Sequence, residues 1–380
     1  EAKSKAYHEY LSSASYRYLM LVHDAWCAAF AWEKKSGAMS PITNVTMETL
    51  MLNSADIEAS RMEIISDLVD QYRFFHWHLA FPEVFEPIPL ADIDDDDAVG
   101  WKGGFDCVLG NPPWEQNELK ETEWFADKDP SIAQASGDTR KRMISALRET
   151  NPVLYRAYQS ALRAYQVSSL MYNNESGLYP MCGRGRINTY KIFAELNLKL
   201  LSDHGLCGCI VPSGIATDDS TKVFFQYLID NNRLRSLYDF ENREGIFPGV
   251  HRSFKFCLLT LSYPSGEAHQ ADFLFFAHSL ADLKEPQRHF QLSASDIALI
   301  NPNTRTCPIF RGKADAELTK YIYRRVPVLI DENDPEHGNP WGISFKQGLF
   351  NMTSDSHLFR TRQELEGQGF ELEGNHFVKG

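Results

Sequence analysis

The sequence lacks the features that define several large protein classes. No run approaches the ~18 consecutive apolar residues that a membrane helix needs, and no signal peptide is visible, so no membrane association is expected. Low-complexity tracts and internal repeats are also absent. Because 43% of the 380 residues are hydrophobic, we expect ordinary globular cores and more than one domain.

Cysteine spacings typical of metal sites are missing as well. Cys207-Gly-Cys209 is too tight for a zinc knuckle and has no complementary second pair, so no metal site is predicted. The seven cysteines are odd in number, and several lie in apolar runs. This usage is typical of reduced core residues in a cytoplasmic protein.

Positive charge is scarce. The chain has 38 Lys and Arg against 51 Asp and Glu, a formal net charge of −13. A general nucleic-acid coat protein neutralises phosphates with an excess of cations, so the balance argues against that class but leaves room for a local basic groove. Part of the acidic excess lies in residues 94–97, which we expect to form a solvated loop.

Residues 105–114 read FDCVLGNPPW and carry the strongest functional signal. The apolar run predicts a buried strand, and Asn111, Pro112 and Pro113 predict a rigid turn at its carboxyl end. Ligands of open α/β sheets bind beyond the carboxyl ends of the strands, so this turn is expected to face a ligand.

The turn is rich in fixed hydrogen-bond acceptors. Asn111 offers an amide oxygen, and Pro112 and Pro113 offer carbonyl groups without N–H donors. Two rigid acceptors hold an exocyclic amino group and shift its nitrogen toward a tetrahedral shape, which frees the lone pair to attack a methyl group. Trp114 supplies a ring for stacking on a planar base, worth about 1–3 kcal/mol. The residues therefore predict an amino-methyltransferase.

Helical patterns flank this motif. Residues 1 to about 80 carry two apolar stripes at helical spacing. His76 and His78 follow them in an aromatic run, where polar tips on a buried segment are a simpler interpretation than metal ligands. A second helical stretch extends from Trp114 to about residue 180, and Asp138 is the expected cap of one of its helices.

Five cations near the Asn-Pro-Pro turn are candidates for DNA contact. They are Arg140, Lys141 and Arg142 on a predicted helix, and Arg184 and Arg186 in a glycine-broken turn. A solvated helical face is the ordinary interpretation of such charges. Their closeness in sequence to the turn makes contact with DNA phosphates the alternative.

Helices and strands alternate from about residue 187. We expect a helix that starts near Tyr190 and stops at Asp203-His204-Gly205, strands over residues 206–211, 234–240 and 254–261, and a helix from Asp218 or Asp219. Continuous apolar strands of this kind predict an α/β fold with a largely parallel sheet covered on both faces. The last two strands, joined by a short connection, are expected to form an antiparallel edge pair.

Residues 105–114 resemble the catalytic motif of gamma-class N6-adenine DNA methyltransferases. Residues 188–193 and the strand ending at Pro212 resemble the next segments of that catalytic domain, and Phe247 falls in a later motif that stacks on the extruded base. Residues 75–77, 103–106 and 239–242 are most similar to very large bacterial methylases, namely fused type IIG-like restriction–modification enzymes and phage-defence methylases.

This resemblance covers roughly residues 70–265 and implies a function. It implies the second half of a Rossmann-like sheet that uses S-adenosylmethionine, with Asn111, Pro112, Pro113 and Trp114 as catalytic residues and Asn111 also near the cofactor. Phe247 and Trp114 would stack on a flipped adenine. The implied partners are double-stranded DNA and nuclease or defence-system subunits or domains.

One family element is missing. The family binds S-adenosylmethionine on a strand followed by a G-x-G turn, ahead of the Asn-Pro-Pro turn, and residues 1–104 contain no such element. Gly183-Arg-Gly185 comes later and follows no apolar strand. We therefore expect the cofactor half to lie upstream of Glu1, and the 380-residue chain alone to bind S-adenosylmethionine weakly or not at all.

The predicted domain organisation has three parts. Residues 1–100 form a helical segment and acidic loop, residues 101–275 a methyltransferase core with a helical insertion at about 115–185, and residues 276–380 the start of a C-terminal, target-recognition region.

Other functions fit the same motif. Turns of this type also serve methyltransferases acting on glutamine in release factors or on guanine N2 in ribosomal RNA, although those chains usually lack long helical insertions. N4-cytosine enzymes more often carry Ser at the position of Asn111. A non-catalytic DNA-binding or scaffold module that kept the fold would explain the missing glycine turn.

Overall fold

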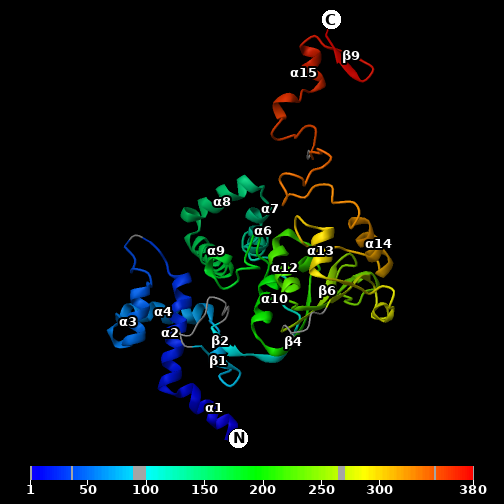
Figure 1. The fold of residues 1–380 in the computed structure, drawn as a ribbon. Coiled ribbons are helices and arrows are strands. Elements are labelled where there is room, and N and C mark those ends of the chain that lie inside the picture. Colours follow the sequence, from blue (N-terminus) through cyan, green and yellow to red (C-terminus); the bar gives the residue numbers. More distant parts are fainter. Residues whose placement is uncertain (1, 36, 89–99, 264–269, 346–347, 380) are drawn as a thin grey trace. The chain divides into compact units, whose positions relative to one another are not determined.

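The computed structural model describes residues 2–35, 37–88, 100–263, 270–345 and 348–379. The chain divides into two compact units, Glu1–Pro327 and Val328–Gly380, which are described separately (Figure 1). The acidic run at residues 94–97 lies outside the described residues. The predicted three-part division stays a prediction.

A six-stranded mixed sheet lies at the centre of the first unit, in the order β3-β4-β6-β5-β7-β8. β3 runs parallel to β4 and β5 runs parallel to β7, whereas β6 lies antiparallel between β4 and β5. The predicted α/β class is confirmed. The strands are β3 (Phe105–Gly110), β4 (Leu201–Val211), β5 (Leu234–Glu241), β6 (Lys255–Ser262), β7 (Ala271–Ala277) and β8 (Phe290–Leu292).

Three expectations about this sheet are wrong. The sheet was expected to be largely parallel, but three of the five described strand pairs are antiparallel, because β6 runs opposite to β4 and β5 and β8 runs opposite to β7. β5 and β6 are antiparallel as predicted, but β6 is interior and pairs on both sides, since its side chains are apolar on both faces. The preceding helix, α10 (Thr189–Lys199), ends before Asp203, and Gly205 lies inside β4. A Cβ on Gly205 would come 2.5 Å from the Phe105 carbonyl oxygen, so this glycine permits the close approach of β3 and β4.

Helices supply much of the main core. The apolar residues of α10, α12 (Lys222–Asp230), α13 (Ala294–Ile300) and α14 (Lys313–Tyr323) pack with one set of strand side chains, including Leu237, Leu259 and Phe273. Alternate strand residues build a smaller group, the Phe256 cluster, which consists of Phe240, Phe256, Leu274 and Ala277. The alternation places the two clusters on opposite faces of the sheet.

The predicted N-terminal helical segment is confirmed. It contains α1 (Ala2–Ser12), α2 (Ala14–Ala31), α3 (Asn44–Leu52), α4 (Ala59–Tyr72) and α5 (Trp77–Ala80), followed by the antiparallel pair β1 (Phe85–Pro87) and β2 (Trp101–Gly103). Ala25, Trp32, Leu50 and Ile65 form its core.

The insertion after the Asn-Pro-Pro turn is also helical and has its own core around Phe125 and Tyr158. Arg163 ties it to α2 by hydrogen bonds to the carbonyls of Ala31 and Trp32. The cap of α8 is Ser136 and not Asp138, which lies in the first turn. The insertion contains α6 (Glu121–Ala126), α7 (Pro130–Gln134), α8 (Gly137–Thr150) and α9 (Pro152–Tyr172).

Two short helices and a hairpin complete the list of elements. α11 (Gly214–Thr217) follows β4 in the first unit. The second unit contains α15 (Arg362–Gly367) and an antiparallel hairpin of β9 (Glu371–Glu373) and β10 (His376–Val378). None of the helices in the described ranges is long and apolar enough to cross a membrane.

Candidate active site

Asn111 directly follows β3, at the end of the sheet where β3, β4, β5 and β7 all have their carboxyl ends. Gly110, the last residue of β3, pairs with Cys209, and Asn111 is exposed beyond it. In the part of the chain that the structure describes, neither the Asn111 amide nor the Pro112 carbonyl has a hydrogen-bond partner. Two acceptors are therefore open to a ligand.

Thr189, the first residue of α10, fixes the rest of the turn. Its hydroxyl donates to the Pro113 carbonyl at 2.7 Å and accepts from the Glu115 N–H at 3.0 Å. The Thr189 N–H in turn donates to the Glu115 carbonyl at 2.9 Å. The contact occupies the Pro113 carbonyl, so Pro112 and Asn111 are the acceptors that remain. The sequence identified residues 188–193 as resembling a segment of the catalytic domain but did not predict this role for Thr189.

Trp114 and Phe247 both pack against the Phe256 cluster, although they come from different loops. The Trp114 indole N–H donates to the Ile210 carbonyl at 3.3 Å, which orients the half-buried ring. Phe247 lies edge-on to Phe256, with ring centroids 5.0 Å apart. The fold thus packs the two predicted stacking residues against one buried cluster, and Trp114 directly follows the acceptors of the turn.

The loop that carries Phe247 is held by Asn242, whose side chain is fully buried. The Asn242 amide donates to the carbonyls of Phe247 and Val250 at 3.0 and 2.9 Å, and accepts from the Phe247 N–H at 2.9 Å. Asn242 is the second residue that the sequence did not single out by role. Its three bonds fix the backbone on which the Phe247 ring stands.

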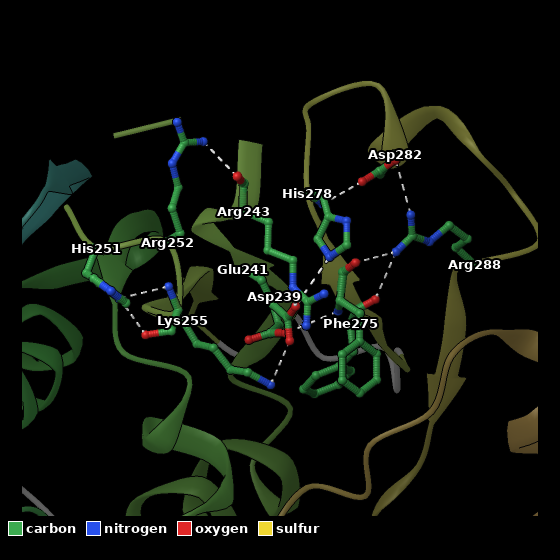
Figure 2. Close-up of polar contacts among 12 residues, drawn as sticks. Asp239, Glu241, Arg243, His251, Arg252, Lys255, Phe275, His278, Asp282 and Arg288 are labelled. Atoms are coloured by element: carbon green, nitrogen blue, oxygen red, sulfur yellow. Dashed lines mark hydrogen bonds and ion pairs between the residues drawn. The ribbon is translucent and has the colours of Figure 1, made fainter. Parts of the chain in front are cut away.

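Two buried carboxylates end β5 beside this loop (Figure 2). Burial raises the pKa of Asp239, which accepts hydrogen bonds from the Ser213 hydroxyl and the Phe276 N–H. Glu241 contacts Arg243, Lys255 and His278. Burial opposes its charge, but the bonds to Lys255 and His278 outweigh that effect and lower its pKa.

Two cavities flank the site. One of about 380 Å³ lies at the carboxyl ends of β4 and β5 and is lined by Tyr190, Asp239 and Lys255 among others. The other, of about 700 Å³, opens between the turn and the helical insertion. Its aromatic walls suit nucleobases, whereas its glutamates disfavour phosphate. The residues that line this second cavity include Trp114, Glu115, Gln116, Glu118, Glu123, Trp124, Tyr165 and Asn188.

A sequence model of the Eco57I restriction-modification methylases matches residues 11–145 and 162–247, more than half of the chain. The chain belongs to this family. No curated protein matches it in sequence.

Solved structures of restriction–modification proteins are similar to this Eco57I-family chain at low sequence identity. The type I methyltransferase subunit from Streptococcus thermophilus is 12% identical, with 70% of this chain and 47% of that chain covered and a TM-score of 0.30. The ATP-dependent type ISP enzyme LlaBIII, bound to DNA, is 11% identical (56% and 12% covered, TM-score 0.28). The type IIG restriction endonuclease BpuSI is 16% identical, with 68% of this chain and 26% of that chain covered and a TM-score of 0.25. The chain spans less than half the length of each.

The predicted DNA-contacting cations of this family member differ in their surroundings. The Arg140 guanidinium is used within the protein, where it donates to the carbonyls of Ile132, Ala133 and Ala135 and closes the end of α7. Arg186 pairs with Glu118, and Arg184 bonds to the Pro180 carbonyl. Lys141 and Arg142 are exposed. Their contact with DNA stays a prediction.

The histidine pair of the aromatic run is part of a polar cluster. His76 Nε2 lies 2.9 Å from an Asp24 carboxylate oxygen, and His78 Nε2 lies 3.0 Å from His23 Nε2. Among the described residues, no group of three or more His, Cys, Asp or Glu side chains has the geometry of a metal site.

The described residues do not fit a complete S-adenosylmethionine site. The prediction that β3 is buried is wrong, because β3 is an edge strand of the described sheet, none of its residues is buried, and its Leu109 side chain is 85% exposed. The glycines at 183 and 185 form no substitute turn, since a Cβ on Gly183 would come 2.1 Å from the Tyr172 carbonyl oxygen. Gly183 therefore serves backbone packing, and Asn111 is the one predicted cofactor contact among the described residues.

Proposed function

We propose that the chain is the catalytic part of a DNA methyltransferase that methylates N6 of an adenine extruded from the duplex, within a restriction–modification or phage-defence system of the bacterial cytoplasm. The observation that supports this most is the pair of open acceptors, the Asn111 amide and the Pro112 carbonyl, beside two aromatic rings. S-adenosylmethionine would supply the methyl group as an electrophile.

The residues of this chain act by binding and positioning. The two hydrogens of an adenine amino group would be donated to the Asn111 side chain and the Pro112 carbonyl. Trp114 and Phe247 would stack on the two faces of the ring, which offsets the few kcal/mol that base extrusion costs. Both contacts would be made through the N–H hydrogens of the amino group, so its nitrogen lone pair would stay free to attack the methyl group.

The choice of adenine as the proposed substrate has a chemical basis in this geometry. Two acceptors match an amino group with two hydrogens, and stacking on the rings of Trp114 and Phe247 would favour a purine over a flexible glutamine side chain. A glutamine substrate would gain little from stacking, since its amide has no aromatic face.

The test is Asn111→Ala in the intact protein, assayed by N6-methyladenine in substrate DNA. We expect methylation to fall at least about 100-fold, with DNA binding retained, because one preorganised electrostatic contact to the reacting group is lost. Asn111→Asp keeps an acceptor oxygen and should retain more activity than the alanine variant. Asn231→Ala, at the exposed end of α12, is the matched control. Undiminished methylation by Asn111→Ala would reject the assignment.

A further inference from the structure

We propose that residues 242–255, here called the β5–β6 loop, bind the DNA phosphates that flank the extruded base. This inference rests on the proposed function, and it assigns a DNA contact that differs from the cations predicted by sequence. Three observations support it. Positively charged side chains surround the Glu241 carboxylate, the Arg252 guanidinium packs against Gly245, and Arg311 is a further cation next to the loop.

The first observation is an excess of positive charge around Glu241 (Figure 2). Its carboxylate contacts Arg243 Nε at 2.6 Å, Lys255 Nζ at 3.1 Å and His278 Nε2 at 3.3 Å. Among the described residues, the terminal nitrogens of Arg243 have no hydrogen-bond partner, and its side chain is largely exposed, so they are available to another acceptor. The Arg243 and Lys255 side chains are 66% and 48% exposed, whereas Glu241 is buried. The cluster therefore presents cationic donors, and not the carboxylate, to solvent.

The second observation is the fixed position of Arg252. Its Nη1 donates to the Arg243 carbonyl at 2.7 Å, and the guanidinium lies against Gly245. Gly245 has a φ of +74°, and a Cβ there would come 2.7 Å from Arg252 Nη1. The backbone at this glycine thus leaves room for the arginine, and the guanidinium keeps an exposed edge for a planar, bidentate contact of the kind that suits phosphate.

The third observation concerns Phe276 at the end of β7. Its φ of +62° is rare for a bulky residue, and the backbone is held there by Asp239 and Arg288. Two cations lie over its ring, Lys255 at 5.1 Å and Arg311 at 5.3 Å from the centroid. Arg311 therefore joins the positive surface next to the loop.

The opposing charges are few. Glu244 is the remaining acid of the loop, Asp282 is paired with Arg288, and Asp239 is buried and bonded to Ser213. Asp218 is exposed and lines the same cavity as Lys255. In a chain of net charge −13, this local excess of cations is unusual. Phe247 stands on the same loop, so the cations lie where phosphates next to an extruded base would pass.

The experiment is DNA binding by the 380-residue chain, without methyl donor, measured by anisotropy of a short fluorescein-labelled duplex across a salt series. Each phosphate contact contributes about 0.9 to the slope of log affinity against log salt. We expect the double variant Arg243→Gln, Arg252→Gln to lower the slope by about 2 and the affinity at low salt by about 10-fold or more. Replacing both arginines by lysine should keep most of the slope.

The matched control removes the same charge from the N-terminal helical segment, as Arg17→Gln with Lys34→Gln, two exposed cations that are not among the predicted DNA contacts, and should leave the slope unchanged. The inference is overturned if the β5–β6 loop variant keeps the slope, if both variants lose it equally, or if the unchanged chain shows no measurable binding. A slope lost as expected, together with normal methylation by Asn111→Ala, would uphold the phosphate site and reject the proposed function.

Discussion

The hydroxyl oxygen of Thr189 lies 2.7 Å from the carbonyl oxygen of Pro113, across a sequence separation of 76 residues. This contact connects the start of α10 to the turn at the end of β3. It also decides which carbonyl of the Pro-Pro pair is open, since Pro113 accepts a hydrogen bond whereas Pro112 accepts none from the residues that the structure describes. The acceptor geometry of the site therefore depends on a residue outside the motif.

Thr189→Val is expected to slow methylation while leaving the fold intact. Valine has nearly the same shape but cannot donate to Pro113 or accept from Glu115, so the turn loses two bonds and gains freedom. We expect kcat to fall about 10-fold to 100-fold, as for other small misplacements of reacting groups, with a smaller change in KM. Thr189→Ser should restore most of the rate, because it returns the hydroxyl. Equal rates for the valine and serine variants would contradict this role.

Asn242→Ala is expected to loosen the Phe247 loop. Three side-chain hydrogen bonds are lost from a fully buried position, which should lower the free energy of unfolding by about 3 kcal/mol in urea titrations. Stacking should also weaken, and 2-aminopurine at the target position should report it by fluorescence in the presence of the protein.

The matched control for that variant is Asn301→Ala. Asn301 also makes three side-chain hydrogen bonds, to Thr304 and Thr306, but lies outside the loop. We expect a comparable loss of stability without the fluorescence change. If the two variants alter 2-aminopurine fluorescence alike, then Asn242 acts only on stability.

Sequence reasoning located the strands better than it located their order. Hydrophobic runs are local, so residues 105–109, 206–211, 234–240 and 254–261 were recognised as strands, and all lie in one sheet. The interior position of β6 depends on pairing with two distant strands, and no local pattern encodes it. The error at Gly205 has the same origin, since a glycine that ends a helix and one that admits a neighbouring strand look alike in sequence.

The site shows a similar division. Asn111 to Trp114 were predicted from their own chemistry, because proline carbonyls, an amide and an indole have fixed properties. The side chains of Thr189 and Asn242 bind backbone atoms of other residues, and no local sequence pattern identifies such contacts. Their roles therefore became visible only with the fold. Arg140 is the converse case. Its charge suggested a contact with DNA, whereas its guanidinium donates hydrogen bonds to carbonyl groups of its own insertion.

Mild acid is expected to destabilise the N-terminal helices through His78 and His23. The His23 Nδ1 proton is donated to the Leu19 carbonyl, so its Nε2 accepts from His78 Nε2–H at 3.0 Å, and protonating this nitrogen breaks the bond. Burial lowers the pKa of His78 to about 4 and also lowers that of His23, while the nearby Asp24 acts in the opposite direction on His23.

The sign of the effect follows from these shifts. In the unfolded chain both histidines bind protons near their ordinary pKa of about 6.5, whereas the folded chain resists protonation. Stability is therefore fully present above about pH 7 and is lost as the pH falls toward about 4. Urea midpoints measured across this range should fall less steeply for His78→Gln than for the unchanged chain. Parallel pH profiles would show that this pair does not govern the acid response.

Calorimetry of the 380-residue chain with S-adenosylmethionine is expected to show no micromolar binding. Asn111 is the one predicted cofactor contact among the described residues, and a nucleoside donor also needs groups for its ribose and base. The exposed Leu109 on the edge strand β3 fits a surface that another sheet segment would cover. The intact protein serves as the positive control. A micromolar dissociation constant for the chain alone would reject this prediction, because both walls of the donor site would then have to lie within these 380 residues.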